Sequence, residues 1–386
     1  MFAQEVLKDL RALVAELGQP HLVEGLASWT QNEARALFAT LENLPRGLLQ
    51  RQREAMRSGP SSIRECQPFS DYAFSADIAI DHVGEEGKVA CVILAGGQGT
   101  RLGKGPKALF PLFPEEDKTL LDIQVENLRK ASATAPIAVM CSPLNIEAIR
   151  KKKFPRAGQE IELFTQGLLP LLDHDGNWFL ESEGKLAQGP DGNGRVFCDL
   201  QRAGILQRWQ ERGIEHIAVI PIDNPLAKPL DPALIHFHRS CGCDVTAACV
   251  LREDPQEKVG ALAMRNGRPR VLEYSEIDPR QREARHPDGS LIYSLANINI
   301  FLFRLSFAKK LVNENFPWHI ADKTAKKFDQ EIAVKKFETF LFDALPLTMR
   351  MPALVYPREE IYAPLKNATG ERSPETVRAA LRSAET

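Results

Sequence analysis

The sequence predicts an α/β protein with a mixed, mainly parallel sheet flanked by helices, and three observations lead to that prediction. Buried-strand runs alternate with helical patterns from about residue 89 onward, which is typical of a parallel sheet covered by helices on both faces. A hairpin pattern lies at 260–274, so antiparallel strands are expected there as well. Before residue 59 the periodicity is helical throughout, so a helical segment precedes the α/β part.

The helical segment has recognisable starts and stops. Thr30 and Glu33 form a capping box, which predicts that a helix begins after Thr30. Gly18 and Pro20 end the preceding helical pattern. The apolar faces of these helices favour packing on the rest of the chain, and a partner-binding surface is the alternative.

The elements of the α/β part follow a turn-rich connection at 59–70. Apolar runs predict strands at 89–94, 137–140 and 217–222, and helical patterns predict helices at 119–130, 145–153 and 200–212. The hairpin strands are expected at 260–264 and 269–274, because Asn266 and Gly267 between them form the strongest short hairpin signal.

The composition excludes several classes of protein. The 386 residues include 49 Lys and Arg against 51 Asp and Glu, a formal charge of −2, so no basic excess is available to bind nucleic acid. No signal peptide and no apolar run long enough to span a membrane are present, so we expect a cytoplasmic protein without membrane contact. The seven cysteines are odd in number and are expected to be reduced. Nothing here predicts an oligomeric state.

The most informative stretch is LAGGQGTRLG at 94–103, which directly follows a buried strand. Its closely spaced glycines let the backbone turn tightly and bring N–H groups close to an anion. Arg101 adds a forked donor suited to phosphate, and Lys107 shortly after it adds a point charge. We expect a loop that binds the phosphates of a nucleotide, with a plain strand–turn–helix connection as the alternative.

Two common phosphate loops do not match this stretch. A Walker A loop needs GxxxxGK[ST], and Gln98 and Gly105 break that pattern. A dinucleotide loop needs GxGxxG, and Leu102 stands where its third glycine belongs. The loop therefore binds phosphate in a third way.

At this point the sequence resembles a known family. The loop followed by Pro106-Lys107 resembles the nucleotide-binding loop of UDP-sugar pyrophosphorylases, in particular the eukaryotic-type UDP-N-acetylglucosamine branch. Further segments resemble that family's motifs in the same order: FTQGLLP at 164–170, AQGPDGNG at 187–194, PIDNPL at 221–226, VG at 259–260, LEYSEI at 272–277 and PLKNA at 364–368. The resemblance spans about residues 85–382.

The resemblance implies a fold and a reaction. The fold is a Rossmann-like sheet of the nucleotide-diphospho-sugar transferase (GT-A-like) type with antiparallel sugar-binding insertions, formed here by a catalytic domain at 69–386 after a helical extension at 1–68. The enzyme is a nucleotidyltransferase that joins UTP and N-acetylglucosamine 1-phosphate and releases pyrophosphate. The chain extends about 20 residues beyond Lys366, so the further β-rich domain of eukaryotic-type relatives is not expected.

Site residues are implied by the same motifs. Charge neutralisation falls to Arg101, Lys107 and Lys366, and UTP binding falls to Leu94, Ala95, Gly96, Gly97, Gln166, Gly192 and Asp223. Asp223 follows a predicted strand, where ligands of α/β sheets bind, and its carboxylate suits Mg²⁺. A turn aspartate is the alternative for Asp223, and a glutamine bonded to backbone is the alternative for Gln166.

The sugar is expected to contact Asn193, Gly260, Glu273, Tyr274 and Asn297. On local sequence alone, Glu273 is equally a charge at a hairpin edge and Asn297 equally a bulge residue.

The sequence departs from the family pattern at three places. Two residues rather than three separate Gly103 from Pro106, so Lys104 is a second candidate for the role of Lys107. Ala296 replaces a glycine before Asn297. In KFETFLFD at 336–343, Thr339 replaces a lysine that reaches a phosphate in the family, and whether Lys335 or Lys336 compensates is open. Another sugar 1-phosphate (glucose, galactose or N-acetylgalactosamine) and a non-catalytic UDP-sugar-binding regulator stay open as alternatives.

Overall fold

The computed structural model describes residues 2–58, 66–80, 88–99, 101–103, 105–152, 161–274 and 276–384. Most of the predicted connection (59–65), Lys104 and the end of the predicted helix at Lys153 lie outside these ranges. The chain forms two compact units. The smaller contains Met1–Ser62, Gly167–Gly192 and Pro317–Thr339, and the larger contains Ile63–Gln166, Asn193–Phe316 and Phe340–Thr386.

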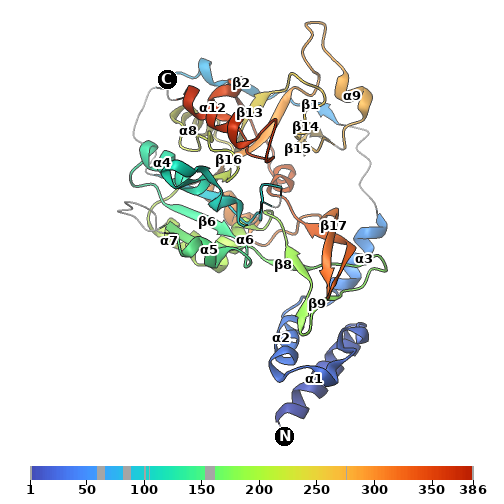
Figure 1. The fold of residues 1–386 in the computed structure, drawn as a ribbon. Coiled ribbons are helices and arrows are strands. Elements are labelled where there is room, and N and C mark those ends of the chain that lie inside the picture. The colour runs from blue at the N-terminus through green and yellow to red at the C-terminus, as the bar shows by residue number, and fades with distance from the viewer. Residues whose placement is uncertain are drawn as a thin grey trace. The chain divides into compact units, whose positions relative to one another are not determined.

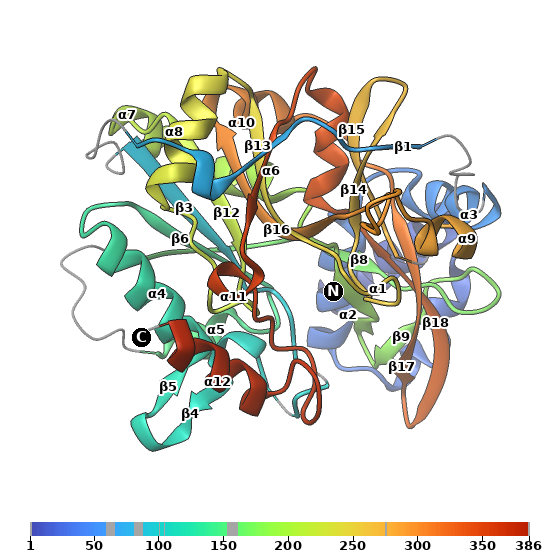
Figure 2. The same cartoon turned by 90° about the horizontal axis from the view of Figure 1, so that it is seen from above.

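The larger unit is built on a mixed sheet with the strand order β2-β19-β13-β16-β12-β3-β6-β7. These strands are β2 Tyr72–Phe74, β3 Val89–Leu94, β6 Ile137–Cys141, β7 Ile161–Thr165, β12 His216–Pro221, β13 Val245–Leu251, β16 Leu295–Arg304 and β19 Ala353–Tyr356. Strands β12, β3, β6 and β7 are parallel, as are β13, β19 and β2, whereas β16 runs antiparallel to β12 and β13 (Figure 2). The predicted sheet class and its strands are confirmed.

Helices cover both faces of this sheet because side chains of a strand point alternately to opposite sides. Cys91 of β3 packs with one group of helices and Val92 with the other. The first group is α4 Leu120–Ala131, α5 Ile146–Arg150, α8 Pro232–Cys241 and α12 Pro374–Ala384, and the second is α6 Val196–Arg202, α7 Ile205–Glu211 and α10 Leu305–Leu311.

The single helix predicted at 200–212 is wrong in its extent, because the structure has two helices there, α6 and α7. Gly204 lies between them with φ 71°, in the left-handed region that ends a helix and that glycine adopts at low cost. The predicted start at Thr119 is confirmed for α4, since Thr119 and Asp122 form a reciprocal capping box.

The predicted hairpin is confirmed as β14 Ala261–Arg265 and β15 Arg268–Leu272. Asn266 and Gly267 have φ of 51° and 72°, the left-handed pair that a two-residue type I′ turn needs. Strand β14 also pairs with β1 (Gln67–Pro68) and β16. Further elements of this unit are β4 Pro111–Phe113, β5 Lys118–Thr119, α9 Pro279–Glu283 and α11 Arg358–Ile361.

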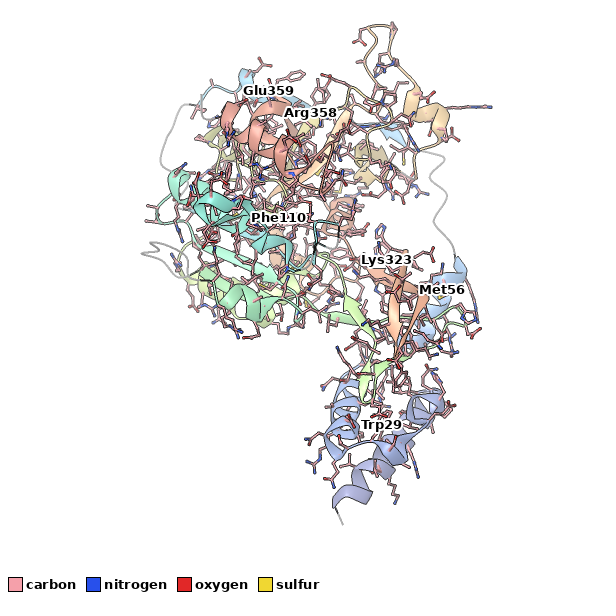
Figure 3. All side chains as sticks on the ribbon, in the orientation of Figure 1. Trp29, Met56, Phe110, Lys323, Arg358 and Glu359 are labelled. Carbon is pink, nitrogen blue, oxygen red and sulfur yellow. The ribbon has the colours of Figure 1, made fainter. Side chains whose placement is uncertain are left out.

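The smaller unit combines helices with short strand pairs and a long hairpin at 319–338 (Figure 1). Its elements are α1 Phe2–Glu16, α2 Gln31–Glu42, α3 Leu48–Ser58, β8 Leu168–Pro170, β9 Leu180–Ser182, β10 Lys185–Leu186, β11 Gln188–Pro190, β17 His319–Lys327 and β18 Gln330–Glu338. The capping box that begins α2 is present as predicted, with Thr30 accepting from the Glu33 backbone. Figure 3 shows the side chains of this unit, including Trp29 before α2.

The apolar faces of the N-terminal helices are used inside the smaller unit. Leu10 and Leu37 pack with Leu172, Trp178 and Phe337, which come from the two later segments. The unit boundaries thus differ from the expected boundary at residue 68, and the division into a helical extension and a catalytic domain stays a prediction. Within the described ranges, no helix has the length and apolar character needed to cross a bilayer.

Candidate functional site

A cleft of about 320 Å³ opens in the larger unit at the carboxyl ends of β3 and β12. Ligands of open α/β sheets bind at this edge. Seven predicted site residues line it: Leu94, Gly97, Arg101, Lys107, Asn193, Asp223 and Lys366. The structure therefore brings together all three predicted phosphate-neutralising cations and the predicted metal ligand.

The glycine-rich loop shapes one wall of the cleft and positions Lys107. The Lys107 backbone N–H donates to the Gly97 carbonyl at 3.1 Å. Gly99 has φ 62°, and a Cβ there would lie 3.3 Å from the Lys107 Cα, so both its backbone conformation and its contact favour glycine. Two residues between Gly103 and Pro106 thus suffice to bring Lys107 to Asp223.

Gly96 and Gln166 meet at the base of this loop. A Cβ on Gly96 would overlap the side-chain oxygen Oε1 of Gln166, so only glycine admits the buried amide here. Ala95 is fully buried beside them, and its backbone N–H and carbonyl bond to the Met140 carbonyl and the Asn145 side chain. These hydrogen bonds hold the backbone at the base of the loop in place.

Asp223 joins the two lysines of the cleft. Its Oδ2 accepts from Lys366 Nζ at 2.5 Å and from Lys107 Nζ at 3.2 Å, and Lys107 also donates to the Leu365 carbonyl at 3.1 Å. Burial alone would raise the pKa of Asp223, but the charges and hydrogen bonds of the two lysines outweigh it and hold the pKa at about 2. The turn-aspartate alternative does not account for these ion pairs.

The pKa values of the two lysines shift in opposite directions, although Asp223 raises both. Burial lowers the pKa of Lys107, and Lys366 and Arg101 add to that effect, while the nearby Asp223 carboxylate opposes it. For Lys366 the Asp223 charge is the largest influence and raises the pKa against burial. The side chain of Lys107 is 16% exposed and that of Lys366 35%, so desolvation weighs more heavily on Lys107.

The segment that carries Lys366 is fixed to the residues beside Asp223. The Leu365 N–H donates to the Asp223 carbonyl at 2.7 Å. The buried Asn224 side chain donates to the Ile361 carbonyl at 2.7 Å and accepts from the Ala363 N–H at 3.0 Å. These hydrogen bonds fix the backbone of the residues that precede Lys366.

Glu257 also holds the segment that carries Lys366. Its carboxylate accepts two bonds from Arg358 of α11, at 2.8 and 3.0 Å, and one from Arg372 at 2.7 Å. Figure 3 labels Arg358 at the start of α11. The Arg372 carbonyl in turn accepts from the Lys366 N–H at 2.8 Å. Glu257 thus connects two arginines on either side of Lys366.

Three residues predicted to bind the sugar lie close together in the larger unit. The Asn297 N–H donates to the Gly260 carbonyl at 2.8 Å, and a Cβ on Gly260 would lie 3.3 Å from a carboxylate oxygen of Glu273. Asn297 donates through its side chain to Asn299 at 3.0 Å, and Asn299 lines the cleft. Asn299 thus places Asn297 next to the cleft that the predicted cations line.

A β-bulge lies directly after Asn297, which itself pairs with Cys249, so the role of Asn297 stays a prediction. The pairing of β13 with β16 shifts so that Ala248 pairs with Ile300 and Cys249 with Asn297. Asn299, within the bulge, has φ 58°. Tyr274 is exposed and is not among the cleft-lining residues.

Gly192 and Thr339 lie together in the smaller unit. A Cβ on Gly192 would overlap the Thr339 carbonyl, and the two residues form an isolated β-bridge. Thr339 is buried, and its hydroxyl donates to the Asp191 carbonyl at 3.1 Å. The predicted uracil contact of Gly192 stays a prediction.

The candidate replacements for the missing lysine are both ion-paired. Lys335 pairs with Asp322 at 2.5 Å, and Lys336 pairs with Glu338 at 2.8 Å. Compensation for Thr339 by either lysine also stays open.

The residues of the cleft fit a magnesium ion that arrives with a nucleotide. Among the described residues, no three His, Cys, Asp or Glu side chains gather as a preformed metal site. Asp223 nevertheless brings one carboxylate to the cleft, and Mg²⁺ needs only one or two carboxylates when phosphates and water complete its shell. The two ammonium groups on Oδ2 oppose a cation there, so Mg²⁺ would need the bound phosphates to draw the lysine charges away from Asp223.

Asn224, Glu257 and Asn299 are site residues that sequence reasoning missed. Asn224 and Glu257 act on Lys366 through backbone and arginine contacts that join segments more than 100 residues apart. A signal for Asn299 was present, since Asn297 and Asn299 are two asparagines two apart within an apolar run.

Comparisons with known proteins indicate the same family as the sequence motifs. The family model for UTP–glucose-1-phosphate uridylyltransferase matches residues 67–370. The chain is 34% identical to human UDP-N-acetylhexosamine pyrophosphorylase-like protein 1, over 97% of this chain and 83% of that protein. It is 29% identical to Saccharomyces cerevisiae UDP-N-acetylglucosamine pyrophosphorylase, over 97% of this chain and 89% of that protein.

A solved structure shares the fold. The Trypanosoma brucei uridine diphosphate N-acetylglucosamine pyrophosphorylase matches with a TM-score of 0.79 and 22% identity, covering 98% of this chain and 84% of that one. The loop at the carboxyl ends of the parallel strands, the cation cluster and the near-complete match lead to one conclusion: the chain belongs to the UTP–glucose-1-phosphate uridylyltransferase family of UDP-sugar pyrophosphorylases, which are nucleotidyltransferases.

Proposed function

We propose that this protein makes UDP-N-acetylglucosamine and pyrophosphate from UTP and N-acetylglucosamine 1-phosphate. The observation that carries the proposal is the group of Arg101, Lys107 and Lys366 around Asp223 in one cleft. The choice of an acetamido sugar is supported by the relatives, which are named as UDP-N-acetylhexosamine and UDP-N-acetylglucosamine pyrophosphorylases.

The reaction needs positioning and charge neutralisation more than proton transfer. An oxygen of the sugar 1-phosphate, already anionic, attacks the α-phosphorus of UTP, and the bond from that phosphorus to the β-phosphate oxygen breaks. Pyrophosphate leaves with the electron pair of the broken bond. Cations beside the reacting phosphates lower the repulsion between the two anions and stabilise the charge that develops on the leaving group.

Each cation has a proposed task. Lys107 is held by Gly97 and Asp223 beside the glycine-rich loop, so we assign it to the UTP phosphates. Lys366 is the more exposed of the two lysines on Asp223, which suits the sugar phosphate. Arg101 is exposed at the mouth of the cleft and serves the outer phosphates.

We assign the remaining predicted residues to the nucleotide or to the sugar. Leu94, Ala95, Gly96 and Gly97 hold the nucleotide by their backbone, and Gln166 and Gly192 read the uracil, since an amide offers a donor and an acceptor to its imide edge. On the sugar side, Asn193, Gly260, Glu273, Tyr274 and Asn297 bind the hydroxyl and acetamido groups. When bound with UTP, Mg²⁺ neutralises phosphate charge, with Asp223 as its carboxylate ligand.

The decisive experiment measures pyrophosphate release with UTP, Mg²⁺ and four sugar 1-phosphates: N-acetylglucosamine, N-acetylgalactosamine, glucose and galactose. We expect kcat/KM for N-acetylglucosamine 1-phosphate to exceed that for glucose 1-phosphate by about 100-fold or more, because a pocket that hydrogen-bonds an acetamido group leaves polar groups unpaired without it. Pyrophosphate release with none of the sugars would overturn the enzymatic proposal, and a preference for another sugar would replace N-acetylglucosamine with that sugar.

The role of Asp223 is tested by Asp223→Asn, with Asp71→Asn as the matched control. Asp71 is also an ion-paired carboxylate, but its partner is the exposed Arg350. We expect Asp223→Asn to lower kcat by about 100-fold or more and Asp71→Asn to leave it unchanged. Unchanged turnover in Asp223→Asn would remove that carboxylate from the mechanism.

A non-catalytic UDP-sugar-binding role is the second candidate, and it rests on Thr339. This residue offers a hydroxyl bonded to the Asp191 carbonyl where the family has a lysine. Calorimetry separates the two functions, because a regulator would bind UTP or a UDP-sugar and release no pyrophosphate. Introducing the lysine with Thr339→Lys would then be expected to create turnover.

A further inference from the structure

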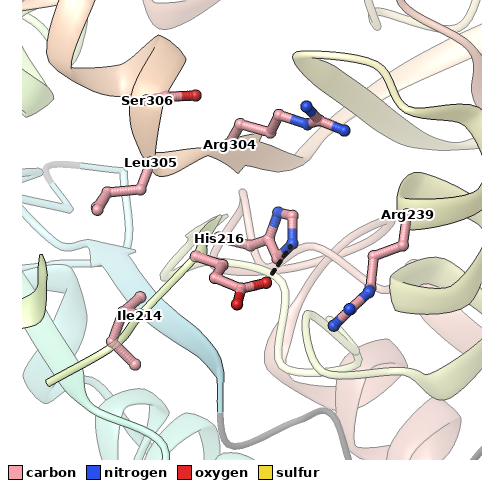
Figure 4. Close-up of a pocket in the computed structure, with 7 residues that line it drawn as sticks. Ile214, His216, Arg239, Arg304, Leu305 and Ser306 are labelled. Carbon is pink, nitrogen blue, oxygen red and sulfur yellow. Dashed lines mark ion pairs between the residues drawn. The ribbon is translucent and has the colours of Figure 1, made fainter.

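A second cavity, of about 480 Å³, lies at the opposite end of β12 from the nucleotide cleft. Its polar lining comes from His216 at the start of β12, Glu215 before it, Arg239 in the last turn of α8, Arg304 at the end of β16 and Ser306 in α10. Figure 4 shows the side chains of Arg304, Arg239 and His216 around one opening. None of these residues has a task in the proposed reaction.

Arg304 carries the argument. Its Nε atom is buried and has no hydrogen-bond partner among the described residues. Within the same ranges, no carboxylate forms an ion pair with the Arg304 guanidinium either. Because Nε is closed off from solvent, an oxyanion in the cavity would meet the terminal nitrogens of this guanidinium, whose charge has no carboxylate partner among the described residues.

Among the residues that the structure describes, one acid, Glu215, lines the cavity and only partly offsets its cations. Glu215 bonds to Lys88 at 2.7 Å, which lowers the pKa of the Glu215 carboxyl, and it lies 3.9 Å from His216 Nε2 (Figure 4). Among the lining residues, Arg239 and Arg304 carry two positive charges and Glu215 carries one negative charge. The cavity wall has a positive excess even though the whole chain is nearly neutral.

The lowered pKa of His238, which contacts the cavity residue His216, is consistent with this positive excess. His238 Nε2 lies 3.2 Å from His216 Nδ1, and its other ring nitrogen lies 2.8 Å from the Thr246 hydroxyl. Burial is the largest cause that lowers the pKa of His238, to about 3, and the charges of His216, Arg304 and Arg239 add to it. His238 therefore stays neutral and braces the His216 ring at the cavity floor.

We propose that this cavity is a second anion site, which binds the phosphate group of a small phosphorylated ligand. The guanidinium of Arg304 meets two phosphate oxygens, Arg239 supplies a second cation, and the Ser306 hydroxyl and His216 ring complete the donor set. Strand β12 separates this site from Asp223 by about 15–20 Å, at 3.3 Å of rise per residue, so both sites can be filled at once.

The test titrates inorganic phosphate into the full chain by calorimetry at low ionic strength. Arg304→Gln is expected to weaken phosphate binding by about tenfold or more, as for the loss of a charge-assisted hydrogen bond. Arg304→Lys keeps the positive charge but loses the paired N–H donors of the guanidinium, so it should bind phosphate with intermediate affinity. Arg350→Gln, which removes an exposed arginine paired with Asp71, should bind phosphate as the native chain does.

Lys366→Gln distinguishes this cavity from the nucleotide cleft. Phosphate binding that survives Lys366→Gln and is weakened by Arg304→Gln supports the proposal. Phosphate binding that is lost in Lys366→Gln and unchanged in Arg304→Gln belongs to the nucleotide cleft and overturns it, as does the absence of binding to the native chain at millimolar phosphate. Arg239→Gln serves as a second variant if circular dichroism shows that Arg304→Gln does not fold, and unchanged binding there also overturns the proposal.

Discussion

At the scale of single residues, Asp223 shows how one carboxylate organises a cleft. Two ammonium groups converge on its Oδ2, and its carbonyl accepts from Leu365. The same residue therefore holds both lysines that we assign to phosphate groups and the backbone that carries one of them. Without phosphate, the lysines are paired with Asp223, and a bound nucleotide can compete for their charges.

The pKa of Asp223 predicts a pH dependence of stability. Its folded-state pKa of about 2 lies below the ordinary value of 3.8, so the folded chain holds fewer protons than the unfolded chain between those values. The stabilisation is complete above pH 3.8 and is lost as the pH falls toward 2, and it amounts to about 2 kcal/mol from the pKa difference. Denaturant unfolding from about pH 5 to 2 should show a steeper loss in the native chain than in Asp223→Asn. Parallel curves for the two proteins would contradict this prediction.

Gly96 is a second residue-scale case, because its lack of a side chain admits Gln166. Gly96→Ala places a methyl group on Gln166 Oε1, so we expect a loss of about 1–3 kcal/mol in the free energy of unfolding and a raised KM for UTP. Gly97→Ala is the matched control for stability, since a Cβ there meets nothing within 4 Å. Equal unfolding free energies for the two variants would refute the close contact.

At the scale of elements, the segment after α11 is held by Glu257 rather than by its own secondary structure. Glu257→Gln weakens both arginine contacts on either side of Lys366. We expect kcat to fall by about 10- to 100-fold while the KM for UTP changes little, because a small displacement of a charged group costs rate when orientation matters. Steady-state kinetics measures this split.

The control for Glu257 is another carboxylate that pairs with arginine. Asp71→Asn breaks an ion pair whose arginine is exposed, so its kcat should equal that of the native chain. An equal loss of kcat in both variants would show that the effect is not specific to the segment of Lys366.

An element can be predicted from the sequence when neighbouring residues determine it, and not when it depends on residues far away in the chain. Strand β3, the β14–β15 hairpin and the start of α4 are set by neighbouring residues, namely an apolar run, an Asn-Gly turn and a capping box. The break between α6 and α7 depends on the left-handed Gly204, which a helical pattern alone does not reveal. The bulge after Asn297 depends on pairing with β13 and could be proposed but not established from the sequence.

At the scale of the whole molecule, burial decides which cysteines can react. All seven are free, and Cys91, Cys141, Cys243 and Cys249 are buried. Burial raises the pKa of Cys141 to about 12 and those of Cys91 and Cys249 further, so their thiolates are not available. We expect a thiol reagent to modify three cysteines in the native chain (Cys66, Cys198 and Cys241) and seven after unfolding. Mass spectrometry identifies the sites, and rapid labelling of Cys91 in the native chain would contradict the buried β3.

The sequence by itself determined the class of the sheet through local apolar and turn patterns, and it indicated the family and several cleft residues through the resemblance of its ordered motifs. Local patterns can do this because a glycine-rich loop after a strand constrains its own backbone. Only the tertiary structure decided that Lys107 and Lys366 share Asp223, that Glu257 and Asn224 hold the segment of Lys366, and that Arg239 and Arg304 face one cavity. These side chains are far apart in the sequence, and charge and hydrogen bonding act over a few ångströms, so their relations exist only once the sheet has brought its strands together.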